Sequence, residues 1–375
     1  MLYQTHARIH LDHIRFNIDG IRQVVGATRK ILVAVKANAY GHGAVEVSRL
    51  AERSGVDWLG VATVPEGIQL RDAGIRVPIL KFSPAFPEEM DAAVRNDLVL
   101  TVCDGENVDA LESVCRAGNV TAVVHLKVDT GMGRLGVIPA DAPTLAAHIA
   151  RHCPHLRLDG VFTHLPKSDG SDPGYTVEQT ARFKTTVDAV HAAMGRRTSV
   201  VHASNSGAVL GCEPAWLDVV RPGIMVYGFY PGEGTPRTIP LRPGMSVLTR
   251  VAFVKRVAAG TSISYGHTWA ASEDTWIATI PAGYADGYNR LFSNRGRVLI
   301  DGRSYPVVGR VCMDQTMINL GPQTTVKVGD EVVLMGRSGA DEISGDEWAR
   351  MLDTITYEVT CQIGGRVTRV YQDRV

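Results

Sequence analysis

Ile31-Leu-Val-Ala-Val35 is a wholly apolar run, and Lys36-Ala-Asn-Ala-Tyr-Gly-His-Gly43 follows it directly. A run of this kind predicts a strand that is buried on both faces, as in a parallel sheet. In an open doubly wound sheet the turn after the first strand usually carries G-x-G-x-x-G, and this segment does not match that pattern. The stretch therefore favours a (β/α)8 barrel and leaves the open sheet as the structural competitor.

Short β-branched runs recur along the first 220 residues, and stretches with apolar residues at helical spacing separate them. Eight βα units within about 230 residues agree with the typical size of a TIM barrel. We therefore expect an α/β fold that begins with such a barrel. The eight predicted strands are 31–35, 58–61, 77–80, 98–102, 122–128, 158–162, 199–203 and 219–220.

The pattern changes after about residue 235, where Gly-Glu-Gly-Thr-Pro (232–236) interrupts the chain. Alternating strands then dominate, and 346–353 is the one clear helix. We predict a barrel domain over 1–235 and a mainly-β C-terminal domain over 236–375, with the first residues of the chain able to pack with the second domain. The predicted strands are 247–257, 276–280, 297–300, 305–308, 317–320 and 331–335.

Composition excludes several classes of protein. Of the 375 residues, 39 are Lys or Arg and 39 are Asp or Glu, so no electrostatic footprint for nucleic acid or an anionic membrane exists. No apolar run approaches the roughly 18–20 residues of a membrane span, and the N-terminal residues do not resemble a signal peptide.

The six scattered cysteines form no C-x-x-C pair, which favours reduced thiols in a cytoplasmic protein. No histidine pair comes with a cysteine ligand motif, so we expect no metal site.

Lys36 is the first candidate for chemistry. It follows a buried strand at its carboxyl end, which is the rim of a TIM barrel where active sites lie. Apolar neighbours lower the pKa of an amine and make it a better nucleophile toward an aldehyde. The alternative is an ordinary surface lysine whose charged end reaches water.

The segment from Val35 to Gly43 closely resembles the pyridoxal phosphate (PLP) lysine motif of alanine racemases, and further motifs of that family follow in order. The resemblance implies an alanine racemase barrel with PLP held as a Schiff base on Lys36. It also implies a homodimer whose active sites are shared, because the C-terminal domain contributes to the partner's site. The further matches are His125–Gly136, Thr163-His164, Asn205-Ser206, Val220–Ile224, Ser264–His267, Cys312–Asp314 and Tyr357-Glu-Val.

The resemblance also assigns the residues around the cofactor. It places Arg221 against the pyridine nitrogen, where a permanently charged donor cannot accept the ring proton. An unprotonated ring is a weaker electron sink, which discourages a long-lived carbanion and transamination. Residues near the phosphate are implied to be Tyr40, Asn205, Ser206, Gly223, Ile224 and Tyr357.

Racemisation needs proton transfer on both faces of the α-carbon, and one base does not easily reach both. The family resemblance implies that Lys36 acts on the D-enantiomer and that Tyr265 of the partner acts on the L-enantiomer. A free phenol has a pKa of about 10. The resemblance suggests that His164 forms a hydrogen bond with Tyr265 and is itself held by Arg221, whose positive charge would lower that pKa.

The family resemblance also implies roles for three further residues. Arg134 would reach the phenolic oxygen of PLP and the substrate carboxylate, a task that suits its planar fork. Met313 would offer its backbone N–H to the same carboxylate from the partner. Lys127 is a candidate for carbamylation by CO2, which would make it anionic and orient Arg134.

We therefore predict an alanine racemase that interconverts L- and D-alanine and supplies D-alanine for peptidoglycan. Activity on serine, and a biosynthetic as opposed to a catabolic role, stay open. A PLP-dependent decarboxylase would be expected to place an acidic residue toward the pyridine nitrogen, and Arg221 argues against it. It would also be expected to have a functional cysteine near the C-terminus, but we interpret Cys361 as a packing residue. A PLP carrier would resemble the barrel alone, so the β domain and Tyr265 argue against that alternative.

Overall fold

The computed structural model describes residues 2–373, and they form two compact units. One unit is Ile14–Arg242, and the other combines the chain up to His13 with Pro243 onward. The domain ranges expected from the sequence, 1–235 and 236–375, stay a prediction. No helix among residues 2–373 has the length and apolar character that crossing a bilayer requires.

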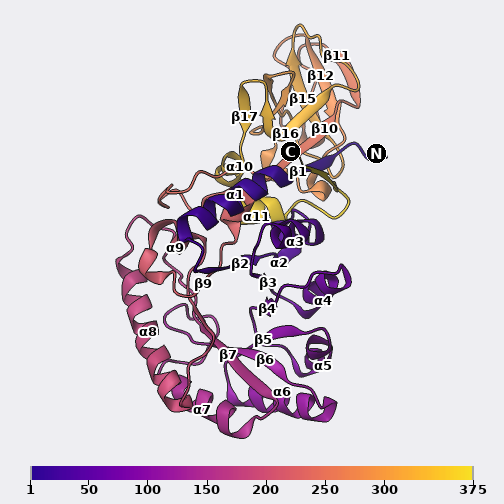
Figure 1. Ribbon diagram of the computed structural model, residues 1–375. Coiled ribbons are helices and arrows are strands. Elements are labelled where there is room, and N and C mark those ends of the chain that lie inside the picture. Colours follow the sequence, from indigo (N-terminus) through magenta and orange to yellow (C-terminus); the bar gives the residue numbers. More distant parts are fainter. Residues whose placement is uncertain (1, 374–375) are drawn as a thin grey trace. The chain divides into compact units, whose positions relative to one another are not determined.

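The unit Ile14–Arg242 contains a closed barrel of eight parallel strands (Figure 1). Each strand pairs with the next along the chain, and the last pairs with the first. The predicted TIM barrel is therefore confirmed, and the open sheet is excluded. The strands are β2 (Lys30–Ala34), β3 (Trp58–Val61), β4 (Ile79–Lys81), β5 (Leu98–Val102), β6 (Ala122–Lys127), β7 (Leu156–Phe162), β8 (Val200–His202) and β9 (Val219–Val220).

Helices follow the strands, and several start at residues that the sequence marks clearly. Thr63 and Glu66 form a capping box at the start of α4, and the Asp104 carboxylate accepts the Asn107 N–H at the start of α6; both caps satisfy N–H groups that have no helical partner. The helices are α1 (Leu11–Val25), α3 (Ala44–Arg53), α4 (Val64–Asp72), α5 (Pro87–Arg95), α6 (Gly105–Gly118), α7 (Ala142–His152), α8 (Gly174–Met194) and α9 (Ser206–Gly211).

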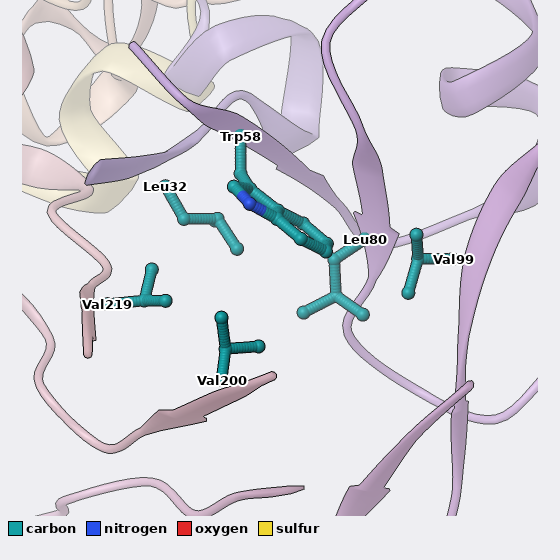
Figure 2. Packing of buried hydrophobic residues seen from close by; sticks show 6 residues of the cluster. All are labelled: Leu32, Trp58, Leu80, Val99, Val200 and Val219. Carbon is teal, nitrogen blue, oxygen red and sulfur yellow. The ribbon is translucent and has the colours of Figure 1, made fainter. Parts of the chain in front are cut away.

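One part of the barrel core is apolar. Six strands each contribute one buried side chain to a single cluster, in which the Trp58 ring is the largest group (Figure 2). Burial of such side chains stabilises the fold by about 1.5–3 kcal/mol each. The cluster consists of Leu32, Trp58, Leu80, Val99, Val200 and Val219.

Aromatic and histidine rings adjoin this apolar cluster. The His125 ring lies 5.2 Å from the Trp58 ring, and the His202 ring stacks on Phe162 at 4.7 Å. The barrel therefore changes from apolar to polar around the histidines, and the functional site begins there.

The other unit is mainly β. A seven-stranded sheet has the order β14-β13-β16-β10-β1-β18, with β17 paired to β16, and a second sheet has the order β11-β12-β15. Its helices include α10 (Gly345–Leu352) and α11 (Thr356–Cys361). The strands are β1 (His6–His10), β10 (Met245–Arg250), β11 (Phe253–Val257), β12 (Thr275–Ile280), β13 (Arg297–Ile300), β14 (Arg303–Pro306), β15 (Thr316–Gly321), β16 (Glu331–Ser338), β17 (Asp341–Ile343) and β18 (Thr368–Gln372).

Two predictions for this unit are wrong. The single strand expected over 247–257 is two strands in different sheets, because the Val251 N–H donates to Asp330 while the next N–H, that of Ala252, donates to Thr279. The chain passes from one sheet to the other between these two residues. The helix at 346–353 is also not alone, since α11 follows it.

Candidate active site

Lys36 begins a short left-handed turn at the carboxyl end of β2. The turn forms the short element α2 (Lys36–Tyr40). Its residues 37–40 all have φ between 51° and 54°. Each non-glycine residue in this conformation costs roughly 1–2 kcal/mol. Strain of this kind persists only where the surroundings fix it, and it gathers at functional sites.

Two side chains fix the turn. The Glu66 carboxylate accepts the Ala37 N–H at 2.7 Å and also the N–H groups of Ala62 and Thr63. The Asn38 side chain accepts the Ala44 N–H at 2.8 Å. The turn that carries Lys36 is thus tied to the start of α4 on one side and to the start of α3 on the other.

Arg221 follows β9 and is 5% exposed. Its guanidinium donates to the carbonyl oxygens of Thr163 and Ala203 at 2.8 and 2.9 Å, to His202 Nδ1 at 2.9 Å and to His164 Nδ1 at 3.4 Å. Burial lowers its pKa to about 9, so Arg221 stays charged at neutral pH. These acceptors hold the charged guanidinium in one orientation.

The Arg221 contacts also determine where the histidine protons lie. His202 Nδ1 accepts from Arg221, so its proton is on Nε2 and is donated to His125 Nδ1 at 3.0 Å. Burial above all, then the Arg221 charge, lowers the pKa of His202 well below its usual value, and burial lowers that of His125 to about 3. Both rings are therefore neutral at physiological pH.

His164 lies where several positive charges meet. Burial first, then the charges of Arg221, Lys127, Arg134 and Lys36, holds the pKa of His164 well below its usual value. Its Nδ1 accepts from Arg221, so the neutral ring carries its proton on Nε2. A neutral imidazole with this tautomer can donate one hydrogen bond from Nε2.

Lys127 ends β6 and is buried, with its amine 4.6 Å from the centre of the Phe162 ring. Burial, together with the charges of Arg221 and Arg134, lowers the pKa of Lys127 to about 7. This lowered pKa leaves part of the amine uncharged near neutral pH. That is the form that reacts with electrophiles.

Arg134 is exposed in the loop that follows β6. The Asp129 carboxylate shapes this loop by accepting the N–H groups of Gly131, Met132 and Gly133 at 2.9–3.1 Å. Burial alone would raise the pKa of Asp129, but these three donors lower it. The loop thus presents the Arg134 guanidinium from a backbone that Asp129 holds in place.

Ser206, Gly223 and Tyr40 lie together after the last two strands and the first. Ser206 Oγ accepts the Gly223 N–H at 2.9 Å, and a Cβ on Gly223 would lie 2.7 Å from the Tyr40 hydroxyl. Asn205 caps α9 by accepting the Ala208 N–H, and Ile224 begins the following 3-10 helix. Hydroxyl and backbone donors around a glycine that must lack a side chain fit a phosphate group.

Three other predicted site residues lie in the β unit. Tyr265 begins a 3-10 helix and is 73% exposed, and Met313 is 53% exposed. Tyr265 and Cys312, the neighbour of Met313, line the same pocket. Tyr357 is half-buried in α11.

Asp286 holds the loop that contains Met313. It is 2% exposed, accepts the Tyr3 hydroxyl and the Gly283 N–H, and pairs with Arg366 at 2.7 Å. Arg366 also pairs with Asp314 at 2.8 Å. The ion pairs therefore connect the buried centre of the unit to the residue that follows Met313.

The barrel brings together the predicted residues Lys36, Lys127, Arg134, His164 and Arg221, whose charges act on one another. Sequence reasoning did not single out His202, His125 or Glu66, which contact these barrel residues, nor Asp286 and Arg366, which hold the loop of Met313 within the β unit. The local sequence around a buried histidine is the same whether the histidine belongs to a hydrogen-bond network or only packs in the core. Their roles therefore become visible only through their partners.

Comparisons with known proteins agree with this geometry. Residues 9–231 match the family model "Alanine racemase, N-terminal domain", and residues 244–371 match "Alanine racemase, C-terminal domain". The chain belongs to the alanine racemase family. It is 46% identical over 369 residues to an alanine racemase of Cutibacterium acnes, covering 98% of this chain and 97% of the relative.

Solved structures of alanine racemases are also similar to this fold. One from Clostridium difficile superimposes with a TM-score of 0.96 at 37% identity, covering all of this chain and 97% of the other. One from Bacillus anthracis, solved with bound L-Ala-P, gives 0.93 at 35% identity, with 99% and 95% covered. At this identity and coverage the likeness extends across both units.

Proposed function

We propose that this protein interconverts L-alanine and D-alanine, and that it holds pyridoxal 5'-phosphate through the amine of Lys36. The observation that carries the proposal is the group of positive side chains around His164. Lys36, Arg221, Arg134 and Lys127 all lie close enough to act on this histidine. When bound, PLP supplies an electron-withdrawing ring that stabilises negative charge on the α-carbon. The family membership of the whole chain supports the choice of alanine.

The residues of this chain fit such a group. Lys36 supplies the amine that an aldehyde needs, and the strained turn directs that amine at one place. Ser206, Gly223 and Ile224 would hold the phosphate, together with Tyr40, Asn205 and Tyr357. Arg221 would donate to the ring nitrogen, and Thr163, Ala203 and His202 keep its guanidinium charged and oriented.

Two residues would move the proton of the α-carbon. Lys36 would take and return it on one face, and Tyr265 of a second copy would do so on the other. A neutral His164 with its proton on Nε2 can donate to the phenolic oxygen of that Tyr265, while Arg221 donates to the other ring nitrogen of His164. Arg134 and the backbone N–H of Met313 would orient the substrate carboxylate.

Two further features belong to this proposal. The exposed Tyr265 and Met313 support a homodimer in which each active site draws on both chains. A pKa of about 7 leaves the Lys127 amine free to attack CO2; the N–C bond forms, a proton leaves to solvent, and the resulting anion pairs with Arg134. Supply of D-alanine for peptidoglycan and a cytoplasmic location follow from the family resemblance and stay predictions.

The test uses the purified protein with PLP. We expect L-alanine to lose its optical activity without release of CO2, and borohydride to fix the cofactor on Lys36 as found by peptide mapping. Lys81 is the matched control, because it is a buried lysine that also lies at the carboxyl end of a barrel strand. Release of CO2 would indicate a decarboxylase, and unchanged optical activity with intact PLP binding would indicate a carrier; either result would overturn the proposal.

A further inference from the structure

Helices α6 and α7 of the barrel unit bring together a group of three potential metal ligands that the proposed active site does not use. Asp109 lies on α6, His148 lies on α7, and Cys153 directly follows α7 (Figure 1). One ligand atom from each lies within 4.8 Å of the other two. Within residues 2–373, no other three His, Cys, Asp or Glu side chains are grouped in this way.

We propose that Asp109, His148 and Cys153 bind a divalent cation of borderline softness, with Zn²⁺ as the physiological example. One oxygen, one imidazole nitrogen and one thiolate sulfur are the three kinds of ligand that protein zinc sites use. Harder cations such as Mg²⁺ and Ca²⁺ prefer oxygen ligands alone. The site is independent of the proposed racemase activity.

The spacing suits a tetrahedral ion after small movements. Bond lengths of about 2.0–2.3 Å require the ligand atoms to lie roughly 3.3–3.7 Å apart. Asp109 Oδ1 and His148 Nε2 are 2.7 Å apart and must separate slightly, and the Cys153 sulfur lies within 4.8 Å of both atoms. The exposed fractions of the Asp109 and His148 side chains are 64% and 35%, so both have room to turn.

Cys153 supplies the sulfur ligand from a buried position, because its side chain is 3% exposed. An incoming M²⁺ would form the M–S bond while the thiol proton leaves to solvent. The exposed Asp109 carboxylate brings negative charge to the same group of atoms, whereas the neighbouring Glu112 carboxylate is already paired with Arg116 and His155.

His152 extends the set. It follows His148 by four residues on α7, and the two rings lie 5.4 Å apart, so His148-x-x-x-His152-Cys153 presents two imidazoles on one helix face. His152 or a water molecule would complete four ligands. Two imidazoles and the thiol thus come from one short segment of the chain, and the carboxylate comes from a different helix, α6. A bound ion would join α6 to α7 and add stability.

The experiment adds Co²⁺ to the purified holoprotein and records the visible absorption that tetrahedral Co²⁺ gives at longer wavelengths than PLP. We expect one tetrahedral Co²⁺ per chain in the wild type and in Cys115→Ser, which removes a buried cysteine of α6 as the matched control. Cys153→Ser and Asp109→Asn should each bind at least about tenfold more weakly. Zn²⁺ should compete for the site.

A second measurement guards against a misfolded Cys153 variant. Asp109 is exposed, so Asp109→Asn should fold normally, and Zn²⁺ should raise the melting temperature of the wild type but not of this variant. Equal Co²⁺ binding by the wild type and Cys153→Ser, an octahedral spectrum, or no binding would overturn the proposal.

Discussion

The left-handed turn at Lys36 offers a test in which stability and function change in opposite directions. Ala37 is exposed and has φ 51° and ψ 49°, and its N–H and carbonyl keep their partners when the side chain is removed. Ala37→Gly therefore removes the cost of the left-handed conformation and little else. That cost is roughly 1–2 kcal/mol.

Glycine also loses more backbone entropy on folding, by roughly 0.5–1 kcal/mol relative to alanine. The difference predicts that Ala37→Gly raises the free energy of unfolding by up to about 1.5 kcal/mol. Ala189→Gly is the matched control, because Ala189 is exposed inside the right-handed helix α8. There glycine should lower stability by about 1 kcal/mol.

The assay is urea unfolding of the three proteins under identical conditions, together with titration of PLP into each apoprotein. A looser turn directs the Lys36 amine less well, so Ala37→Gly should bind PLP more weakly than the wild type, while Ala189→Gly should bind it equally well. If Ala37→Gly lost stability as Ala189→Gly does, or if PLP bound more tightly, the view that strain holds Lys36 in place would be refuted.

Three further predictions concern other parts of the molecule. Arg366→Gln should raise KM for alanine several-fold with little change in kcat, because the ion pairs that hold Asp286 and Asp314 beside Met313 are lost; steady-state kinetics with an unchanged PLP spectrum would check this. In CO2-free buffer, the free energy of unfolding of the wild type should rise relative to that of Lys127→Met as the pH increases from about 7 toward 10, by about 1 kcal/mol per pH unit. The reason is that the Lys127 amine is neutral in the folded protein and protonated in the unfolded chain over this range. Urea midpoints that change in parallel for the two proteins would contradict this prediction. Gly223→Ala should weaken PLP binding, measured by titration, because the new Cβ pushes the Tyr40 hydroxyl aside.

Much of the barrel could be predicted from the sequence because its strands are short apolar runs. β3 and β5 begin and end where expected, since their residues are buried on both faces and polar residues flank them. The β unit was harder. Residues 247–257 read as one alternating run, and nothing local marks the point after Val251 where the chain changes sheets.

The site could be predicted only as far as its motifs extend. Lys36, Arg134 and Arg221 stand in distinctive runs, and the barrel does bring their charges together around His164. The left-handed turn and the His202–His125 pair could not be predicted, because both depend on partners distant in the sequence. Where Tyr265 and Met313 act stays a prediction, since they belong to the other unit.

The most direct test of the two-base proposal is exchange of the α-proton with solvent deuterium, followed separately for each enantiomer by NMR. With Tyr265→Phe, we predict that D-alanine still exchanges through Lys36, while exchange of L-alanine falls together with racemisation by about 10²–10⁴-fold. Tyr305→Phe, in a strand of the same unit, serves as the control and should behave as the wild type. Equal slowing of both enantiomers, or undiminished exchange of L-alanine, would contradict the assignment of one face to each residue.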